Sequence, residues 1–157
     1  MALKLYNTLK RRKEEFRPLA KGEVGIYTCG LTVYNYGHIG NFRSFVFADL
    51  LRRYLEWKGH RVKHIMNITD VGHMTADDQL ALAGEDKIEK SARERGLSPR
   101  EIADFYTMAF FEDIARLNLK KAWLYPRATD HIEEMQAIIE KLLKKRAGIQ
   151  ERRECVF

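Results

Sequence analysis

Three observations predict an α/β fold built on a parallel sheet. Residues 24–29 form an apolar run typical of a buried strand, and the run ends at Gly30. A glycine-punctuated stretch follows, and residues 41–58 then place apolar side chains at helical spacing. Residues 61–66 alternate polar with apolar side chains, which is typical of a second strand. This order makes a βαβ unit, whose strands are parallel and whose crossover is right-handed.

The segments on either side follow simpler patterns. Residues 3–6 are predicted to be a short strand, and residues 10–17 a charged connector. Past Asp70 the chain becomes acidic and rich in small residues, so residues 76–86 are expected to form a loop.

A helical region is predicted over about residues 85–145, after the βαβ unit. Residues 87–94 fit a short helix. Ser98 fits the N-cap of a longer helix, because a proline follows it and Glu101 stands where it can bond back to the cap. Thr129 is expected to cap the last helix, whose apolar stripe consists of Ile132, Met135, Ile138, Ile139, Leu142 and Leu143.

The bulk composition limits the class of protein. The chain has 157 residues and a formal net charge of +6, which suits either a polyanionic partner or an ordinary solvated basic surface. Two cysteines, Cys29 and Cys155, do not make a disulfide scaffold. The sequence contains neither a secretory signal nor an apolar run of membrane-spanning length. We therefore expect a cytoplasmic, reducing environment.

Polar groups follow both strands of the predicted unit. Ligands of open parallel sheets bind beyond the carboxyl ends of the strands. Cys29 closes one strand, His38 and Gly40 lie in the turn that opens the helix, and residues 67–70 follow the other strand. A glycine-rich turn at a helix start suits phosphate, because backbone N–H groups are free there. All three groups are expected to converge on one crevice.

Five motifs resemble the cysteinyl family of class I aminoacyl-tRNA synthetases and occur in that family's order. Residues 37–41 (GHIGN) resemble its HIGH signature, with Asn41 where histidine is usual. The other matching stretches are residues 5–9, 27–34, 67–70 and 126–132. The resemblance covers about residues 3–145. It implies a Rossmann-like class I synthetase catalytic domain with a parallel sheet, incomplete in this chain.

The resemblance also implies an activity. Members of this family activate L-cysteine with ATP, with Mg²⁺ as the expected accompanying ion, and transfer it to tRNA(Cys). It implies that His38 and Asn41 are catalytic and that ATP is held by Gly37, His38, Gly40 and Asn41. The cysteine and its adenylate would contact Cys29, Gly30, Thr32, Asn67 and Thr69.

Cys29 is further implied to be one ligand of a zinc ion that binds the substrate thiolate. Zinc accepts sulfur well and keeps an open position for a ligand. Such a contact would separate cysteine from serine, whose hydroxyl binds zinc poorly. The remaining zinc ligands are expected to be missing from this chain. Without the surrounding motif, Cys29 would be interpreted as a buried structural thiol, and Thr32, Asn67 and Thr69 as turn and cap residues.

The resemblance stops near Lys145. We therefore assign residues 1–145 to the N-terminal part of a nucleotide-binding catalytic domain and residues 146–157 to an aberrant or disordered tail, with Cys155 as a bystander. Some codon choices for the tail, read one base later, spell the kind of sequence with which the family continues. This predicts a translated frameshift and a chain that cannot make cysteinyl-tRNA alone.

Two other functions remain open at this stage, as does the oligomeric state. One is a ligase that joins activated cysteine to an amino sugar, as in mycothiol synthesis, and has no RNA partner. The other is a non-catalytic fragment that binds nucleotide or RNA.

Overall fold

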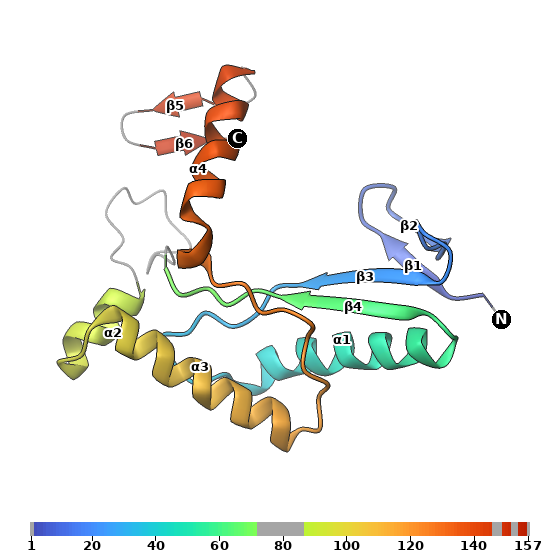
Figure 1. Cartoon of the computed structure of the whole chain (residues 1–157), viewed down its shortest axis with the longest axis horizontal. Helices are drawn as coiled ribbons and strands as arrows, with labels where there is room; N and C mark the ends of the chain where they lie inside the picture. The colour runs from blue at the N-terminus through green and yellow to red at the C-terminus, as the bar shows by residue number, and fades with distance from the viewer. Residues whose placement is uncertain (1, 72–86, 146–148, 152–153, 157) are drawn as a thin grey trace.

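The computed structural model describes residues 2–71, 87–145, 149–151 and 154–156 (Figure 1). Its elements in chain order are β1 (Lys4–Asn7), β2 (Arg12–Glu15), β3 (Glu23–Thr28), α1 (Ile39–Trp57), β4 (Arg61–Met66), α2 (Lys87–Arg95), α3 (Pro99–Arg116), the 3₁₀ turn η1 (Ala128–His131), α4 (Ile132–Lys144), β5 (Ile149–Glu151) and β6 (Glu154–Val156).

The predicted βαβ unit is present. Strands β3 and β4 pair in parallel from Glu23↔Arg61 to Thr28↔Met66, and α1 makes the connection between them. Helix α1 begins at Ile39, two residues earlier than predicted, because His38 caps it with its own side chain. The arrowheads of β3 and β4 point toward α2 and away from the β1–β2 hairpin (Figure 1).

A third parallel segment, residues 123–128, extends the sheet on the far side of β4. The N–H of Met66 donates to the Leu124 carbonyl at 3.1 Å, and that of Ile68 donates to the Pro126 carbonyl at 2.8 Å. Two parallel bridges, Ile65↔Leu124 and Ile68↔Arg127, fix its direction. The sequence pattern did not predict this segment as a strand, because a proline interrupts it.

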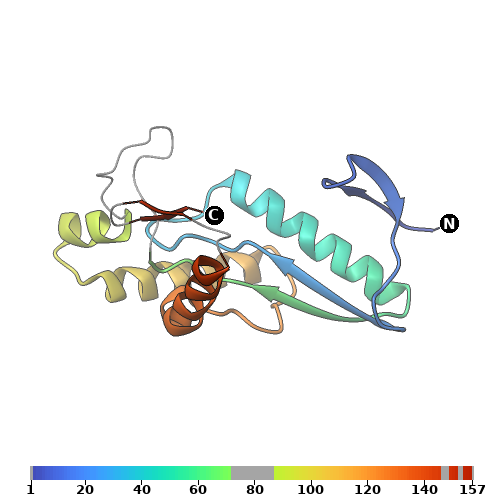
Figure 2. The ribbon, with the colours of Figure 1, turned by 90° about the horizontal axis from the view of Figure 1, so that it is seen from above.

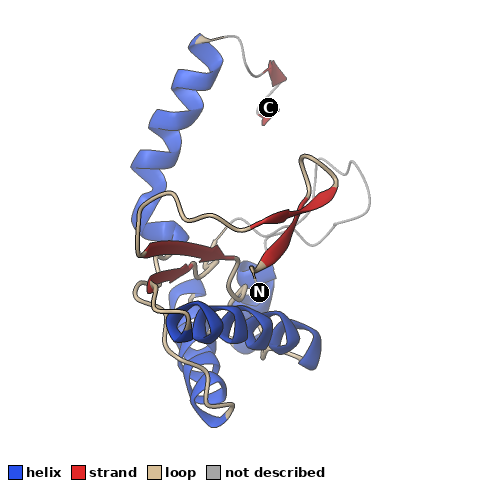
Figure 3. Ribbon diagram, turned by 90° about the vertical axis from the view of Figure 1, so that its right-hand side faces the viewer, coloured by secondary structure: helices blue, strands red, loops and turns tan. Residues whose placement is uncertain are grey.

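Helices α1, α2 and α3 lie on one side of the sheet, and α4 rises on the other (Figures 1 and 3). The largest fully buried side chains belong to the sheet, the loop before α1, and helices α2 and α3: Val33, Ile68, Ile88, Ile102, Tyr106 and Phe110. An ion pair of 2.6 Å between Arg127 and Asp104 ties the third segment to α3. The core therefore lies beneath the carboxyl half of the sheet.

The predicted cap of α3 is confirmed, whereas the predicted cap of α4 is wrong. Ser98 accepts from the Glu101 N–H, and the Glu101 carboxylate accepts from the Ser98 N–H at 2.8 Å. Thr129 lies inside η1, and α4 begins only at Ile132. The N–H and hydroxyl of Thr129 donate to the Asp70 carboxylate at 3.0 and 2.6 Å. The buried carboxylate of Asp70, which follows β4, thus accepts these hydrogen bonds in place of a local cap.

Two further expectations need correction. The charged connector 10–17 contains β2, which pairs antiparallel with β1. Strand β2 consists of four charged residues, so it lacks the apolar alternation by which a strand is recognised, and Lys10 and Arg12 form ion pairs with Glu14 along the hairpin. The segment 146–157, predicted to be an aberrant or disordered tail, contains antiparallel strands β5 and β6 at its described residues 149–151 and 154–156. The loop predicted at 76–86 falls outside the described residues.

Helix α4 projects from the sheet and is viewed nearly end-on in Figure 2. Among the described residues of α4, none is buried, and Ile138 is 57% exposed. Within the described ranges, no helix combines the length and apolar character needed to cross a bilayer.

Candidate functional site

The chain continues in parallel beyond the carboxyl ends of β3 and β4. Thr32 and Thr69 form a parallel bridge. The N–H of Val33 donates to the Thr69 carbonyl, and the N–H of Thr69 donates to the Leu31 carbonyl, each at 3.1 Å. The two loops that carry most of the predicted site residues therefore run side by side.

Asn67 joins these loops through its side chain. Its Oδ1 accepts from the Gly30 N–H and from the Tyr27 hydroxyl, each at 3.1 Å. Its Nδ2 donates to the Thr69 hydroxyl at 3.0 Å. A Cβ on Gly30 would lie 1.8 Å from the Asn67 carbonyl oxygen, so only glycine fits this close approach. Asn67 thus links the end of β3 to the loops that follow β3 and β4.

The turn around His38 is held by a reciprocal pair of cap hydrogen bonds. His38 Nδ1 accepts from the Gly40 N–H at 3.0 Å, and Asn41 Oδ1 accepts from the His38 N–H at 3.0 Å. Because Nδ1 accepts, the ring carries its proton on Nε2. Because Asn41 accepts through Oδ1, its Nδ2 remains a donor. The turn therefore presents two donors at the positive end of α1.

Two adjoining hollows open at this turn. Gly30, Thr32, His38 and Asn41 line one of about 380 Å³. Cys29 and Gly40 line the other, of about 700 Å³, which lies between β3 and α1. The structure therefore divides these residues between two hollows that share the first turn of α1, where one crevice was expected. Of the other predicted residues, Gly37, Asn67 and Thr69 line neither hollow. Gly37 packs against Phe42, since a Cβ there would lie 2.8 Å from the phenyl ring.

Cys29 does not fit a zinc site by itself. Its thiol is free and exposed, and the described residues contain no group of three His, Cys, Asp or Glu side chains that could hold a metal. A catalytic zinc ion needs three protein ligands and a structural one needs four. The described donor set falls short of both, and the reaction proposed below has no zinc step.

A buried histidine supports the sheet beneath the site. His64 is 3% exposed, and its Nε2 lies 2.8 Å from the Thr28 hydroxyl. Burial lowers the pKa of His64 below its ordinary value of 6.5, and the charge of Arg52 lowers it further. A neutral imidazole at this position keeps the Thr28 contact without placing a charge under the site.

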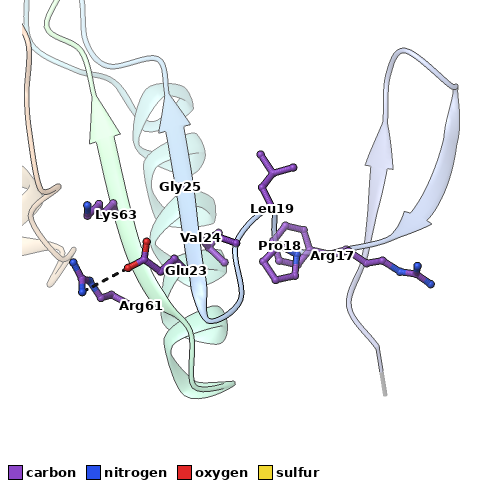
Figure 4. Close-up of a pocket in the computed structure, with 10 residues that line it drawn as sticks. Arg17, Pro18, Leu19, Glu23, Val24, Gly25, Arg61 and Lys63 are labelled. Carbon is purple, nitrogen blue, oxygen red and sulfur yellow. Dashed lines mark ion pairs between the residues drawn. The ribbon is translucent and has the colours of Figure 1, made fainter.

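A separate hollow of about 360 Å³ lies at the amino ends of β3 and β4 (Figure 4). Pro18 and Leu19 approach it from the segment after β2, and Arg61 pairs with Glu23 across the strands at 3.6 Å. Ligands of parallel sheets bind at the opposite, carboxyl edge. This hollow is therefore not the candidate site.

Two residues at the site were not singled out as functional in the sequence. Tyr27 reaches Asn67 with its hydroxyl, and its place in the matching stretch 27–34 was the available signal. Lys87, the first residue of α2, lines the hollow that contains His38. No local pattern marks Lys87, because its position depends on how α2 packs.

The amino-acid sequence is similar to known proteins over most of its length. The family model for the class I (C) tRNA synthetase catalytic domain matches residues 15–156. The chain is 53% identical over 142 residues to a cysteine--tRNA ligase of Treponema denticola, covering 90% of this chain and 28% of the relative. It is 49% identical over 145 residues to the enzyme of that name from Chlorobium chlorochromatii, covering 92% and 30%. For Thermococcus gammatolerans, the identity is 44% over 145 residues, covering 92% and 28%.

The parallel βαβ unit with a capped HIG turn is consistent with an α/β domain of the class I synthetase type. The chain belongs to the class I (C) tRNA synthetase catalytic-domain family. This confirms the predicted fold class and family. The chain spans less than a third of the length of the relatives described above. These relatives give no support to the amino-sugar ligase alternative.

Proposed function

We propose that this chain supplies the nucleotide-binding part of an enzyme that activates L-cysteine with ATP and transfers it to tRNA(Cys). The observation that carries the proposal is the His38 turn, because His38 and Asn41, each with a donor left over from the cap, line one hollow together with Gly30 and Thr32. The names of the relatives support the choice of amino acid and acceptor.

Catalysis of the activation step depends mainly on positioning the substrates and stabilising charge. The cysteine carboxylate attacks the α-phosphorus of ATP, and pyrophosphate leaves with the electron pair of the broken P–O bond. His38 Nε2–H and Asn41 Nδ2–H donate to phosphate oxygens as negative charge moves to the leaving group. Mg²⁺ accompanies the triphosphate. Thr32, Asn67 and Thr69 surround the cysteine and its adenylate.

The substrates of such an enzyme indicate the surface charge and the cell compartment that suit it. ATP and tRNA are polyanions, and the formal net charge of +6 favours their approach. We place the protein in the cytoplasm, where both substrates occur.

A chimera tests the proposal. Residues 1–145 of this chain replace the matching segment of the Treponema denticola enzyme, and cysteine-dependent ATP–pyrophosphate exchange is measured. His38→Ala is expected to lower the exchange rate at saturating ATP by about 10²–10³-fold, the range for loss of one transition-state donor. His131→Ala is the control, because its ring faces Glu134 on α4.

Three results would count against the proposal. The first is a folded chimera without exchange activity. The second is exchange that proceeds equally well with serine. The third is a His38→Ala variant with the normal rate, which would remove His38 from the phosphate site.

A further inference from the structure

The hollow that contains His38 is bordered by the start of helix α2. Lys87, the first residue of α2, lines this hollow together with Thr32, His38 and Asn41. The hollow thus receives a lysine side chain from a segment far along the chain. A hollow of about 380 Å³ that is lined by a cation and by two neutral donors is suited to a polyanionic ligand.

The packing of α2 determines where Lys87 lies. Ile88 and Ala92 are 1% and 3% exposed, so this face of the helix belongs to the core. The Ser91 hydroxyl donates to the Tyr34 carbonyl at 3.2 Å, which ties α2 to the loop before α1. Arg95 lies over the Tyr106 ring at 5.2 Å and holds the other end of the helix. The first turn of α2 is therefore fixed at the hollow.

The ammonium group of Lys87 lies over an aromatic ring at the rim. Its Nζ is 5.7 Å from the centroid of the Tyr34 ring, within the range of a cation–π contact. A phosphate oxygen offers the ammonium group a charge-assisted hydrogen bond, which is stronger than a cation–π contact. The N-termini of α1 and α2 add two positive dipole ends beside the same hollow.

We propose that Lys87 binds the phosphate chain of the nucleotide and moves from the Tyr34 ring to a phosphate oxygen when ATP enters. The inference rests on the proposed function, since it assumes that the His38 hollow receives the triphosphate. Lys87 thus acts as a binding residue for the phosphate chain. It adds charge that Asn41 and the neutral His38 ring do not provide.

The test is calorimetric titration of the full chain with ATP, inorganic triphosphate and adenosine. Lys87→Met is expected to weaken binding of ATP and triphosphate about tenfold and to leave adenosine unchanged. Lys87→Arg is expected to retain most of the affinity, because it keeps the charge. Lys90→Met is the matched control, since Lys90 on the same helix lines the neighbouring hollow with Lys87. Circular dichroism checks that each variant is folded.

The outcomes separate the inference from the proposed function. Lys87→Met with normal ATP affinity, beside a weakened His38→Ala, would overturn the inference and leave the function standing. Equal losses of ATP and adenosine would also overturn it, because they indicate a structural role. A folded chain that binds no ATP would overturn the proposed function. In the chimera, Lys87→Met is expected to raise KM for ATP more than it lowers kcat, and the reverse pattern would contradict phosphate binding in the ground state.

Discussion

Three glycines of the predicted site, Gly30, Gly37 and Gly40, lie where a Cβ would meet another atom closely, and none has a backbone conformation in the left-handed region. Gly30 faces the Asn67 carbonyl, and a Cβ on Gly40 would lie 2.7 Å from Cε1 of the His38 ring. Gly25 is different, because a Cβ there has nothing within 4 Å. The sequence shows a glycine at each of these positions, and only the surrounding atoms show at which of them a side chain would collide.

We expect Gly30→Ala to destabilise the chain by about 1–3 kcal/mol, the range for overpacking. The added methyl group would meet backbone, which cannot turn aside as a side chain can. Gly25→Ala is the control and is expected to be neutral or slightly stabilising. Urea unfolding of both variants measures the difference. Equal midpoints for the two variants would contradict the close approach at Gly30.

His64 predicts a pH dependence of stability. Its pKa in the folded chain is below the ordinary value of 6.5, so the unfolded chain binds the proton more readily. Stability is therefore fully present above pH 6.5 and is lost as the pH falls below it. Thermal unfolding between about pH 5 and 7.5 measures the slope. His64→Gln removes the titrating group and is expected to flatten this slope; an unchanged slope would assign it to other groups.

At the scale of elements, the same device begins both long helices. In α1 the box consists of His38 and Asn41, and in α3 of Ser98 and Glu101. Both satisfy backbone N–H groups that a helix start leaves unpaired. The box of α1 also orients a ring and an amide toward a hollow, so a stabilising motif becomes part of the candidate site.

We expect Ser98→Ala to lower the free energy of unfolding by about 1 kcal/mol, because the Glu101 N–H loses its acceptor. Ser44→Ala is the control. Ser44 is exposed inside α1, where alanine is the better helix former. Chemical unfolding monitored by circular dichroism compares the two variants. A Ser98→Ala variant as stable as Ser44→Ala would show that the cap contributes nothing.

Across the whole molecule, burial is unevenly distributed. Helix α3 has six buried residues, including Tyr106 and Phe110. Helix α4 has none among its described residues and projects from the sheet (Figure 3). Regions with few buried contacts open at lower free energy than the core. The chain should therefore contain at least two levels of local stability.

Hydrogen exchange is expected to show this difference. Amides of α4 should exchange through local opening, whereas the central amides of α3 should exchange only with global unfolding. Mass spectrometry of peptic fragments over a denaturant series separates the two cases. Equal protection of both helices in a monomeric sample would contradict the expected ordering.

Sequence alone determined the features that depend on neighbours a few residues apart. The βαβ unit follows from two strand patterns around one helical period, and the Ser98 cap from a residue bonding three positions away. The HIG turn was recognised for the same reason, with its glycines and histidine adjacent. These features were predictable because their hydrogen bonds and periodic patterns involve residues that are close together in the sequence.

Tertiary structure decided the rest. The Asp70–Thr129 bonds join residues 59 apart, and no local rule connects them. Burial of Ile88 and Ala92 brings Lys87 to the His38 hollow. The division of the site into two hollows arises where α1 packs against β3. In each case the position of a side chain is set by how whole elements pack, and sequence spacing does not encode that packing.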